Sequence, residues 1–130
     1  MQQALDNDRP IFLQVKEAIE GDILSGLLKP DDQIPSNSQL VSFFGINPVT
    51  VHKGITLLAE EGTVYKKRGL GMFVSANAPM ALRKKYGRAF AGEYIDPLVQ
   101  QARLLGMNQQ EVQALLDQAF NNRQVRSKND

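Results

Sequence analysis

The sequence predicts a mainly α-helical protein with one small β-hairpin, which belongs to the α+β class. Apolar residues recur at steps of three and four along most of the chain, a spacing that is typical of helices packed on one face. The spacing changes once, at residues 63–75, to two short β-prone runs around a pair of glycines. A length of 130 residues suits one compact domain, or a small domain with an appendage.

The first helix is predicted over residues 10–25. Pro10 suits its first turn, and Gly26 suits its C-terminal stop. The segment "LLKPDDQIP" that follows is predicted as a loop, because its two prolines exclude a helix. The apolar face of this helix consists of Phe12, Val15, Ile19 and Ile23.

Two further helices joined by a tight turn are predicted between residue 36 and about residue 61. Ser36 and Gln39 have the spacing of a capping box, which opens a short helix that ends at Gly45. Asn47 can cap the next helix, with Pro48 at its first position, where no N–H is needed. The apolar face of that helix consists of Val51, Ile55, Leu58 and Ala59.

The hairpin is predicted from the stretch "TVYKKRGLGMFVS", residues 63–75. Two β-prone runs flank the tetrapeptide Arg68-Gly69-Leu70-Gly71, and two glycines at a tight turn between such runs indicate a hairpin. The order helix, short helix, turn, helix and hairpin is the layout of a winged helix–turn–helix domain. In this fold the third helix enters a DNA major groove, and the hairpin reaches the neighbouring backbone or minor groove.

A helical segment is predicted beyond a linker at residues 76–79. Pro97 is expected to kink or split this segment. Asn108 is expected to cap the last helix, with Glu111 three residues on. We therefore predict a winged helix domain at residues 1–75 and a helical dimerisation segment with a polar tail at residues 76–130.

The charge distribution supports a surface that faces a polyanion. Residues 45–90 carry eight basic residues against Glu60 and Glu61, a net charge of +6 in a chain whose net charge is +1. On charge alone, a solvated face of scattered lysines weighs about as much as a DNA-binding face. The same two interpretations apply to the cluster Arg83-Lys84-Lys85 with Arg88.

The candidate DNA-binding residues lie at the helix starts and in the hairpin. The Asn-Pro start points a helix N-terminus outward, where unsatisfied N–H groups and the dipole favour phosphate and the first side chains can reach base edges. Arg68, at a glycine-flanked tip, can lie in a narrow minor groove, and glycines let the backbone approach closely. The predicted set is Ser36, Ser38, Gln39, Asn47, Pro48, Val49, Thr50, His52, Lys53, Lys66, Lys67, Arg68, Gly69 and Gly71.

Composition argues against several other classes of protein. With no cysteine and His52 as its only histidine, the chain cannot build a usual zinc site, and no metal or cofactor is expected. No serine lies in a nucleophile-elbow context, so an enzyme is not expected. No apolar run approaches the roughly 18 residues of a membrane span, and the polar start is unlike a secretory signal. A cytoplasmic protein without a membrane partner is predicted.

Residues 10–75 resemble the GntR family of bacterial transcription regulators. The stretches that carry the resemblance are "PIFLQVKEAIEGDILSGLLKPDDQIPSNSQL" and "GINPVTVHKGITLLAEEGTVYKKRGLGMFV". The Asn-Pro turn and the short C-terminal helical segment resemble the YtrA branch. This resemblance implies a homodimer that binds a palindromic operator in double-stranded DNA, usually as a repressor.

The chain also departs from the family pattern. The family often has arginine at the positions of Ser38, Pro48 and His52, and these departures predict a modest affinity for each half-site. Asp31 replaces a usual glycine, and Gly54 replaces a usual alanine.

The C-terminal helices are predicted to dimerise, because two or three helices over about 45 residues cannot bury their apolar stripes alone. An effector, if one exists, is expected between subunits or between domains, and its identity is unknown. The predicted dimer interface consists of Leu82, Tyr86, Phe90, Tyr94, Leu98, Leu105, Val112 and Leu116.

Two functions stay open on the sequence. The first is a sequence-specific, DNA-binding transcriptional regulator that acts as a homodimer. The second is a winged-helix module that contacts only proteins and binds no DNA, since a fold does not fix a function. The near-neutral total charge and the absent arginines favour the second function, whereas the basic hairpin favours the first.

Overall fold

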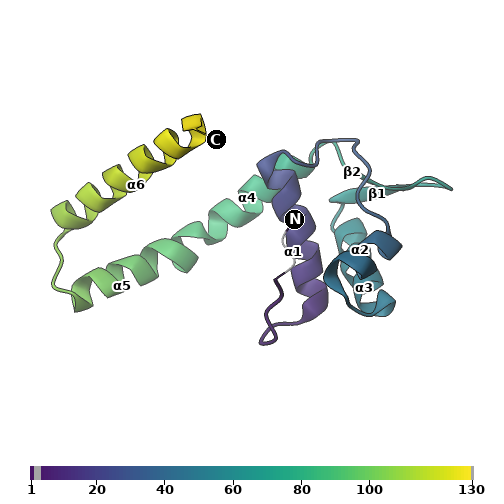
Figure 1. Ribbon diagram of the computed structural model, residues 1–130, viewed down its shortest axis with the longest axis horizontal. Helices are drawn as coiled ribbons and strands as arrows, with labels where there is room; N and C mark the ends of the chain where they lie inside the picture. Colours follow the sequence, from purple (N-terminus) through teal and green to yellow (C-terminus); the bar gives the residue numbers. More distant parts are fainter. Residues whose placement is uncertain (2–3, 130) are drawn as a thin grey trace. The chain divides into compact units, whose positions relative to one another are not determined.

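The computed structural model describes residue 1 and residues 4–129. The described chain divides into two compact units, Met1–Tyr86 (unit 1) and Gly87–Asp130 (unit 2). Figure 1 labels the elements, whose order agrees with the sequence prediction. They are α1 (Ile11–Ser25), α2 (Asn37–Phe44), α3 (Pro48–Glu60), β1 (Val64–Lys67), β2 (Gly71–Val74), α4 (Ala78–Phe90), the π-helical turn η1 (Ala91–Ile95), α5 (Asp96–Leu104) and α6 (Gln109–Asn129).

Capping side chains set the starts of α2 and α3. Ser36 Oγ accepts a hydrogen bond of 3.1 Å from the N–H of Gln39, and Gln39 Oε1 accepts one of 2.8 Å from the N–H of Ser36. Asn47 Oδ1 accepts a hydrogen bond of 2.7 Å from the N–H of Val49, and Pro48 is the first residue of α3. The predicted capping box and Asn-Pro start are thereby confirmed.

The core of unit 1 lies between α1, α2, α3 and the hairpin. α1 and α3 pack closely at Gly54, where an added Cβ would lie 2.8 Å from the carbonyl oxygen of Phe12. Of the four residues predicted on the apolar face of α3, three are buried, but Ala59 is exposed at the rim of that face. Val15 is fully buried, and a cluster of further buried apolar residues consists of Ile19, Ile23, Ile34, Leu40, Val51, Ile55, Leu58, Val64, Val74, Ala78 and Leu82.

β1 and β2 form the predicted hairpin, which extends away from the three helices in Figure 1. The strands are antiparallel and pair Val64 with Val74 at the base and Lys67 with Gly71 at the tip. We call this hairpin, with its connecting turn at residues 68–70, the wing.

Residues 31–34, predicted only as part of a loop, lie along the outer edge of β2. The N–H of Ile34 donates a hydrogen bond of 2.9 Å to the carbonyl oxygen of Met72. Next to it, Gln33 forms an isolated antiparallel bridge with Phe73. The outer edge of β2 is therefore fastened to the domain near the base of the wing.

The predicted linker at residues 76–79 is wrong in its second half. α4 already begins at Ala78, and Ala78 is buried in the core of unit 1. Pro79 is accommodated because proline is compatible with the first turn of a helix. The division between the compact units falls after Tyr86, later than the predicted boundary after residue 75. The reason is that the early turns of α4 contribute Ala78 and Leu82 to the core of unit 1.

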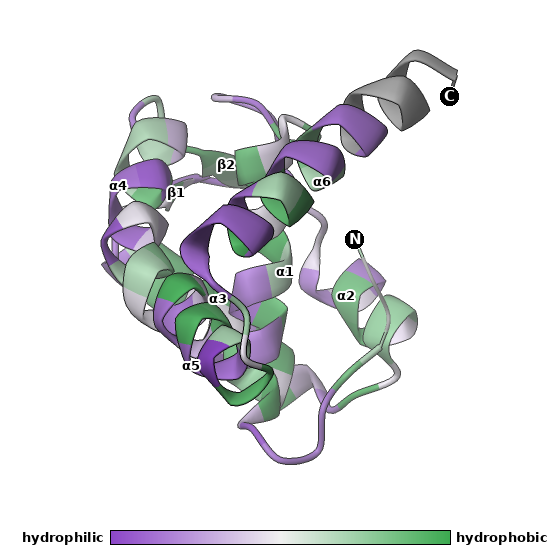
Figure 2. Cartoon of the chain, turned by 90° about the vertical axis from the view of Figure 1, so that its left-hand side faces the viewer, coloured by the Kyte–Doolittle hydropathy of each residue, from purple (hydrophilic) through white to green (hydrophobic). Residues whose placement is uncertain are grey.

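Unit 2 is helical. At the point where Pro97 was expected to disturb the helix, the π-helical turn η1 passes into α5, and the proline lies in the first turn of α5. The predicted cap of α6 is confirmed, because Asn108 Oδ1 accepts a hydrogen bond of 2.8 Å from the N–H of Glu111. Figure 2 shows apolar residues on both α5 and α6.

Among the described residues, no helix combines the length and the apolar character that crossing a membrane requires. The same residues contain no cluster of three or more acidic or histidine side chains that could hold a metal ion.

Candidate nucleic-acid interface

The start of α3 presents the side chains that the sequence analysis assigned to DNA contact. Asn47, Pro48, His52 and Lys53 are exposed, and Val49 is 74% exposed. An apolar side chain so open to water at a helix start is available for contact with a thymine methyl group.

The structure corrects one part of the prediction for α3. The first backbone N–H groups were expected to be unsatisfied and free for phosphate. Instead, Asn47 uses its side chain to accept the N–H of Val49, and its carbonyl oxygen accepts the N–H groups of Thr50 (3.1 Å) and Val51 (3.2 Å). Pro48 has no N–H to offer. Contact at this helix start must therefore come from side chains and from the helix dipole.

Thr50 is half-buried, unlike its neighbours. Lys53 lies beside α1, with its Nζ 3.9 Å from the centre of the Phe12 ring. This cation–π contact restrains a long side chain that would otherwise sample many rotamers.

The start of α2 is also exposed at Ser36, Ser38 and Gln39. Ser36 and Gln39 bond each other's backbone through the capping box. These two side chains therefore have a structural task that competes with DNA contact.

The wing carries the predicted basic residues on its open side. Lys66, Lys67 and Arg68 are all exposed. The Lys67 Nζ lies 4.3 Å from the centre of the Phe73 ring, which anchors this lysine at the base of the turn. Gly69 and Gly71 have φ values of 76° and 121°, which side chains rarely tolerate.

Asp31 is hydrogen-bonded to the first strand of the wing. It has a left-handed φ of 69°, at the position where the resembling family usually has glycine. Its carboxylate accepts a hydrogen bond of 2.6 Å from the Tyr65 hydroxyl of β1. This hydrogen bond raises the pKa of Tyr65, because the neutral phenol is the form that donates. Asp tolerates this backbone conformation better than most side chains.

α3, the start of α2 and the wing line an open hollow of about 490 Å³. It brings together His52 of α3 and Lys66 of β1, which the sequence analysis named separately. Asn37, at the first position of α2, also lines this hollow, although no sequence prediction included it. The signal that could have found it is its place directly after the predicted cap.

A buried carboxylate that the sequence analysis missed connects α1 with α4. Glu20 is 1% exposed. It accepts hydrogen bonds from the Lys85 Nζ (3.0 Å) and from the Tyr86 hydroxyl. Burial would lower the pKa of Lys85, but the hydrogen bond and the charge of Glu20 outweigh it and raise that pKa. Lys85, one of the basic residues proposed as an extension of the DNA surface, is thus engaged within the domain.

The predicted dimer stripe divides between the two units. Leu82 is 3% exposed and belongs to the core of unit 1, and Tyr86 is half-buried beside Glu20. Phe90 and Tyr94 are exposed, with ring centres 5.4 Å apart. The remaining members of the stripe lie in unit 2, where Leu105 is exposed and the others are half-buried: Leu98, Val112 and Leu116.

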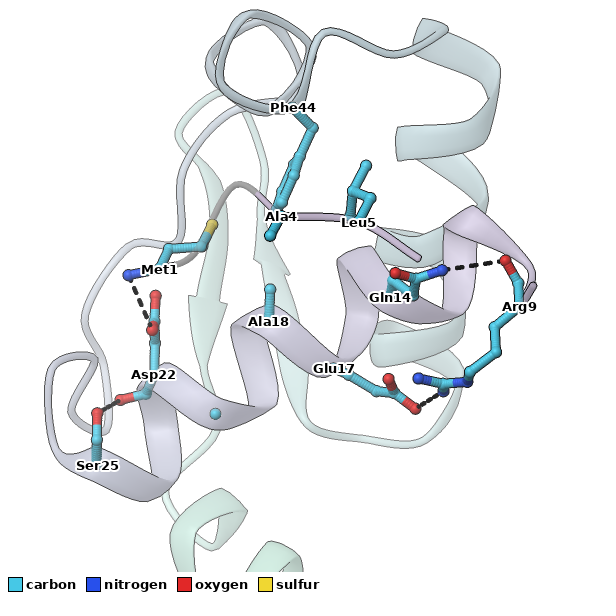
Figure 3. Close-up of a pocket in the computed structure, with 11 residues that line it drawn as sticks. Met1, Ala4, Leu5, Arg9, Gln14, Glu17, Ala18, Asp22, Ser25 and Phe44 are labelled. Atoms are coloured by element: carbon cyan, nitrogen blue, oxygen red, sulfur yellow. Dashed lines mark hydrogen bonds and ion pairs between the residues drawn. The ribbon is translucent and has the colours of Figure 1, made fainter. Parts of the chain in front are cut away.

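A second hollow, of about 520 Å³, lies between α1, the N-terminal residues and Phe44 of α2. Figure 3 shows Phe44 and Ala4 on the side of the hollow opposite Ala18 of α1. Arg9 pairs with Glu17 at 2.5 Å along its edge. None of the predicted DNA-binding residues lines this hollow.

Three helices, a capped turn before an outward-facing third helix and a basic, glycine-tipped wing define a winged-helix protein of the DNA-binding class. Residues 12–74 match the model of the family described as "Bacterial regulatory proteins, gntR family". The protein is therefore a member of the gntR family through its winged-helix domain.

Comparison with known proteins agrees with this assignment. The chain is 36% identical over 73 residues to the HTH-type transcriptional repressor YtrA of Bacillus subtilis. The aligned residues make up 56% of this chain and 56% of YtrA. It is 36% identical to the AraR DNA-binding domain solved in complex with operator ORX1, with a TM-score of 0.50, covering 58% of this chain and 92% of that one.

A GntR family transcriptional regulator from Listeria monocytogenes shares the fold over more of the chain. Its TM-score is 0.69 at 22% identity, covering 88% of this chain and 98% of that chain. The chain spans 31% or less of the length of several longer repressors that it matches.

Proposed function

We propose that the protein is a transcriptional regulator that binds a specific DNA sequence through α3 and the wing. The observation that carries this proposal is the joint exposure of the α3 start and of the basic wing on one compact unit. The side chains of Val49, Thr50, His52 and Lys53 would read base edges in the major groove. Arg68 would enter the adjacent minor groove, whose negative potential attracts arginine.

We further propose that the regulator acts as a homodimer on a palindromic operator, and that it represses. Unit 2 carries exposed apolar side chains whose burial against a second copy would be favourable: Phe90, Tyr94, Leu104, Leu105, Leu115 and Phe120. A two-fold dimer would contact half-sites whose centres lie about 34–36 Å apart, or a multiple of that distance. Repression is supported by the similarity to YtrA, which is a transcriptional repressor by name.

A chromosomal DNA target also implies a cytoplasmic protein. No effector class is assigned. If an effector acts on this regulator, we propose that it binds between the subunits of the dimer.

The test starts with a random duplex library, from which the purified protein selects its preferred sequence. The selected duplex and a scrambled duplex of equal composition are then compared by gel shift at several salt concentrations. We expect preferential binding of the selected duplex and an affinity that falls steeply with salt, because neutralised phosphates release counterions. Equal retention of both duplexes at every salt concentration would contradict sequence-specific binding.

A substitution in α3 sharpens this test. Thr50→Ala should change which bases the protein selects at one position of each half-site, since base contacts specify and phosphate contacts position. If this variant selects the same sequence as the wild type, Thr50 does not contact a base that determines specificity.

The alternative function, a module that contacts only proteins, has its own discriminating experiment. Charge reversal at Lys66, Lys67 and Arg68 should abolish regulation in cells if the wing binds DNA. Retention of the regulatory phenotype by that triple variant would favour the protein-only module.

A further inference from the structure

The turn of the wing is hydrogen-bonded to a side chain of the domain. Gln33 lies beside β2, and its Nε2 donates a hydrogen bond of 2.6 Å to the carbonyl oxygen of Leu70. Leu70 lies in the turn itself, two residues beyond Arg68. This contact therefore acts further out along the wing than the backbone bridge between Gln33 and Phe73.

Gly71 leaves the space in which the Gln33 amide lies. A Cβ added at Gly71 would be 2.6 Å from Gln33 Nε2, closer than real Cβ contacts come. The φ of 121° at Gly71 also excludes most side chains. From its sequence, Gly71 is expected to let the backbone approach DNA closely, and Gln33 has no predicted role. The structure shows the two residues as a fitted pair.

A wing of this size needs such support. Each of its strands has four residues, and an isolated two-stranded hairpin is only marginally stable in water. A turn that is disordered in the free protein must lose conformational entropy when it binds, which weakens the affinity. A turn held in its bound conformation beforehand avoids that loss.

We propose that Gln33 is a positioning residue for DNA binding, which orders the turn at residues 68–70 so that Arg68 is directed at the minor groove. This inference rests on the proposed function. Gln33 acts through the carbonyl oxygen of Leu70, and its effect on binding therefore depends on Arg68.

A double-mutant cycle on the selected duplex tests this dependence. Gln33→Met keeps the length of the side chain but removes the donor. We expect Gln33→Met and Arg68→Ala each to weaken binding about tenfold, the equivalent of one lost polar contact. The double variant should bind about as weakly as Arg68→Ala alone, because both changes disable one element. Losses that multiply to about a hundredfold would mean that Gln33 acts independently of Arg68, and would overturn the proposal.

The free protein gives a second readout that needs no DNA. Hydrogen exchange and NMR relaxation of the amides of Gly69 to Gly71 should show faster motion in Gln33→Met, with the helices unchanged. Gln110→Met, on the exposed surface of α6, is the matched control and should leave the wing amides unchanged. Gly71→Ala should reproduce the wing motion of Gln33→Met by displacing the amide.

The two readouts separate the two hypotheses. If the wild-type protein binds selected and scrambled DNA equally, the proposed function fails, and the relaxation data still decide whether Gln33 orders the turn. If the wild-type protein is specific but Gln33→Met has wild-type affinity or wild-type wing motion, the inference about Gln33 is wrong. The proposed function is then unaffected.

Discussion

Gly54 of α3 packs directly against the carbonyl oxygen of Phe12 in α1. A Cβ added at Gly54 would lie 2.8 Å from that oxygen. The glycine replaces an alanine that the resembling family usually has, and the short approach of the two helices explains it. A main-chain oxygen inside a helix cannot rotate away, so an added methyl group would have to move one helix.

We predict that Gly54→Ala lowers the stability of the protein. Alanine is favoured over glycine in a helix by about 1 kcal/mol, but overpacking of this kind costs about 1–3 kcal/mol. The clash should therefore outweigh the gain in helix propensity. Chemical unfolding followed by circular dichroism measures the difference.

Gly21 of α1 is the matched control for this prediction. It is also a helical glycine in unit 1, but an added Cβ would meet no atom within 4 Å. Gly21→Ala should therefore raise stability by roughly 0.5–1 kcal/mol. If both substitutions stabilise the protein, α1 and α3 do not pack as closely at Gly54 as the structure shows.

Stability at alkaline pH should depend on Tyr86. Burial, and then its hydrogen bond to Glu20, raise the pKa of the Tyr86 phenol. A raised folded-state pKa means that the unfolded chain loses this proton first as the pH rises. The stabilisation is therefore complete below the ordinary tyrosine pKa of about 10 and is lost as the pH rises beyond it.

Tyr86→Phe tests this dependence. We expect the variant to be less stable at neutral pH by about 1–3 kcal/mol, because Glu20 loses a donor while it stays buried. Its stability should also fall less steeply above a pH of about 10. Some alkaline loss should persist, since the raised pKa of Lys85 acts in the same direction. An identical pH profile for both proteins would contradict the role of the phenol.

Arg68→Ala should weaken DNA binding and make it less sensitive to salt. If Arg68 lies in the minor groove beside the phosphates, its loss should reduce the slope of log affinity against log salt by about 1. Lys29→Ala, an exposed basic residue outside the predicted DNA-binding set, serves as the control and should leave the slope unchanged. Equal slopes for Arg68→Ala and the wild type would exclude this arginine from the interface.

Phe90→Glu should dissociate the proposed homodimer. Phe90 is 53% exposed in the single chain, and a carboxylate buried in an apolar interface would be strongly unfavourable. Light scattering at tens of micromolar should report a dimer for the wild type and a monomer for the variant. Leu82→Ala is not a suitable probe, because Leu82 is buried within unit 1 and its loss would lower folding stability instead. A monomeric wild-type protein would refute the dimer itself.

The features that the sequence could predict are local ones. The capping box of Ser36 and Gln39, the start at Asn47 and Pro48, and the glycines of the wing each depend on residues a few positions apart. Such patterns specify helix starts and tight turns before any tertiary structure forms. For the same reason, the order of elements in the winged helix followed directly from the sequence.

The features that the sequence could not predict depend on distant contacts. Glu20 has the spacing of an ordinary surface residue, four positions after Lys16, yet it is buried by α4 and bonded to Tyr86. Gln33 lies in a proline-flanked loop and bonds a residue 37 positions away. Neither contact leaves a signal in a single sequence, because polar residues in loops and on helices are usually solvated.

The bond between Glu20 and Tyr86 has a practical consequence for dissecting the molecule. A recombinant fragment that stops at residue 75 would leave Glu20 without its phenol donor and remove Ala78 and Leu82 from the hydrophobic centre. A fragment that continues through Tyr86 would keep all three. A fragment made to study the DNA-binding domain alone should therefore end at or after Tyr86. The fragment that stops at residue 75 should aggregate or unfold at a lower temperature.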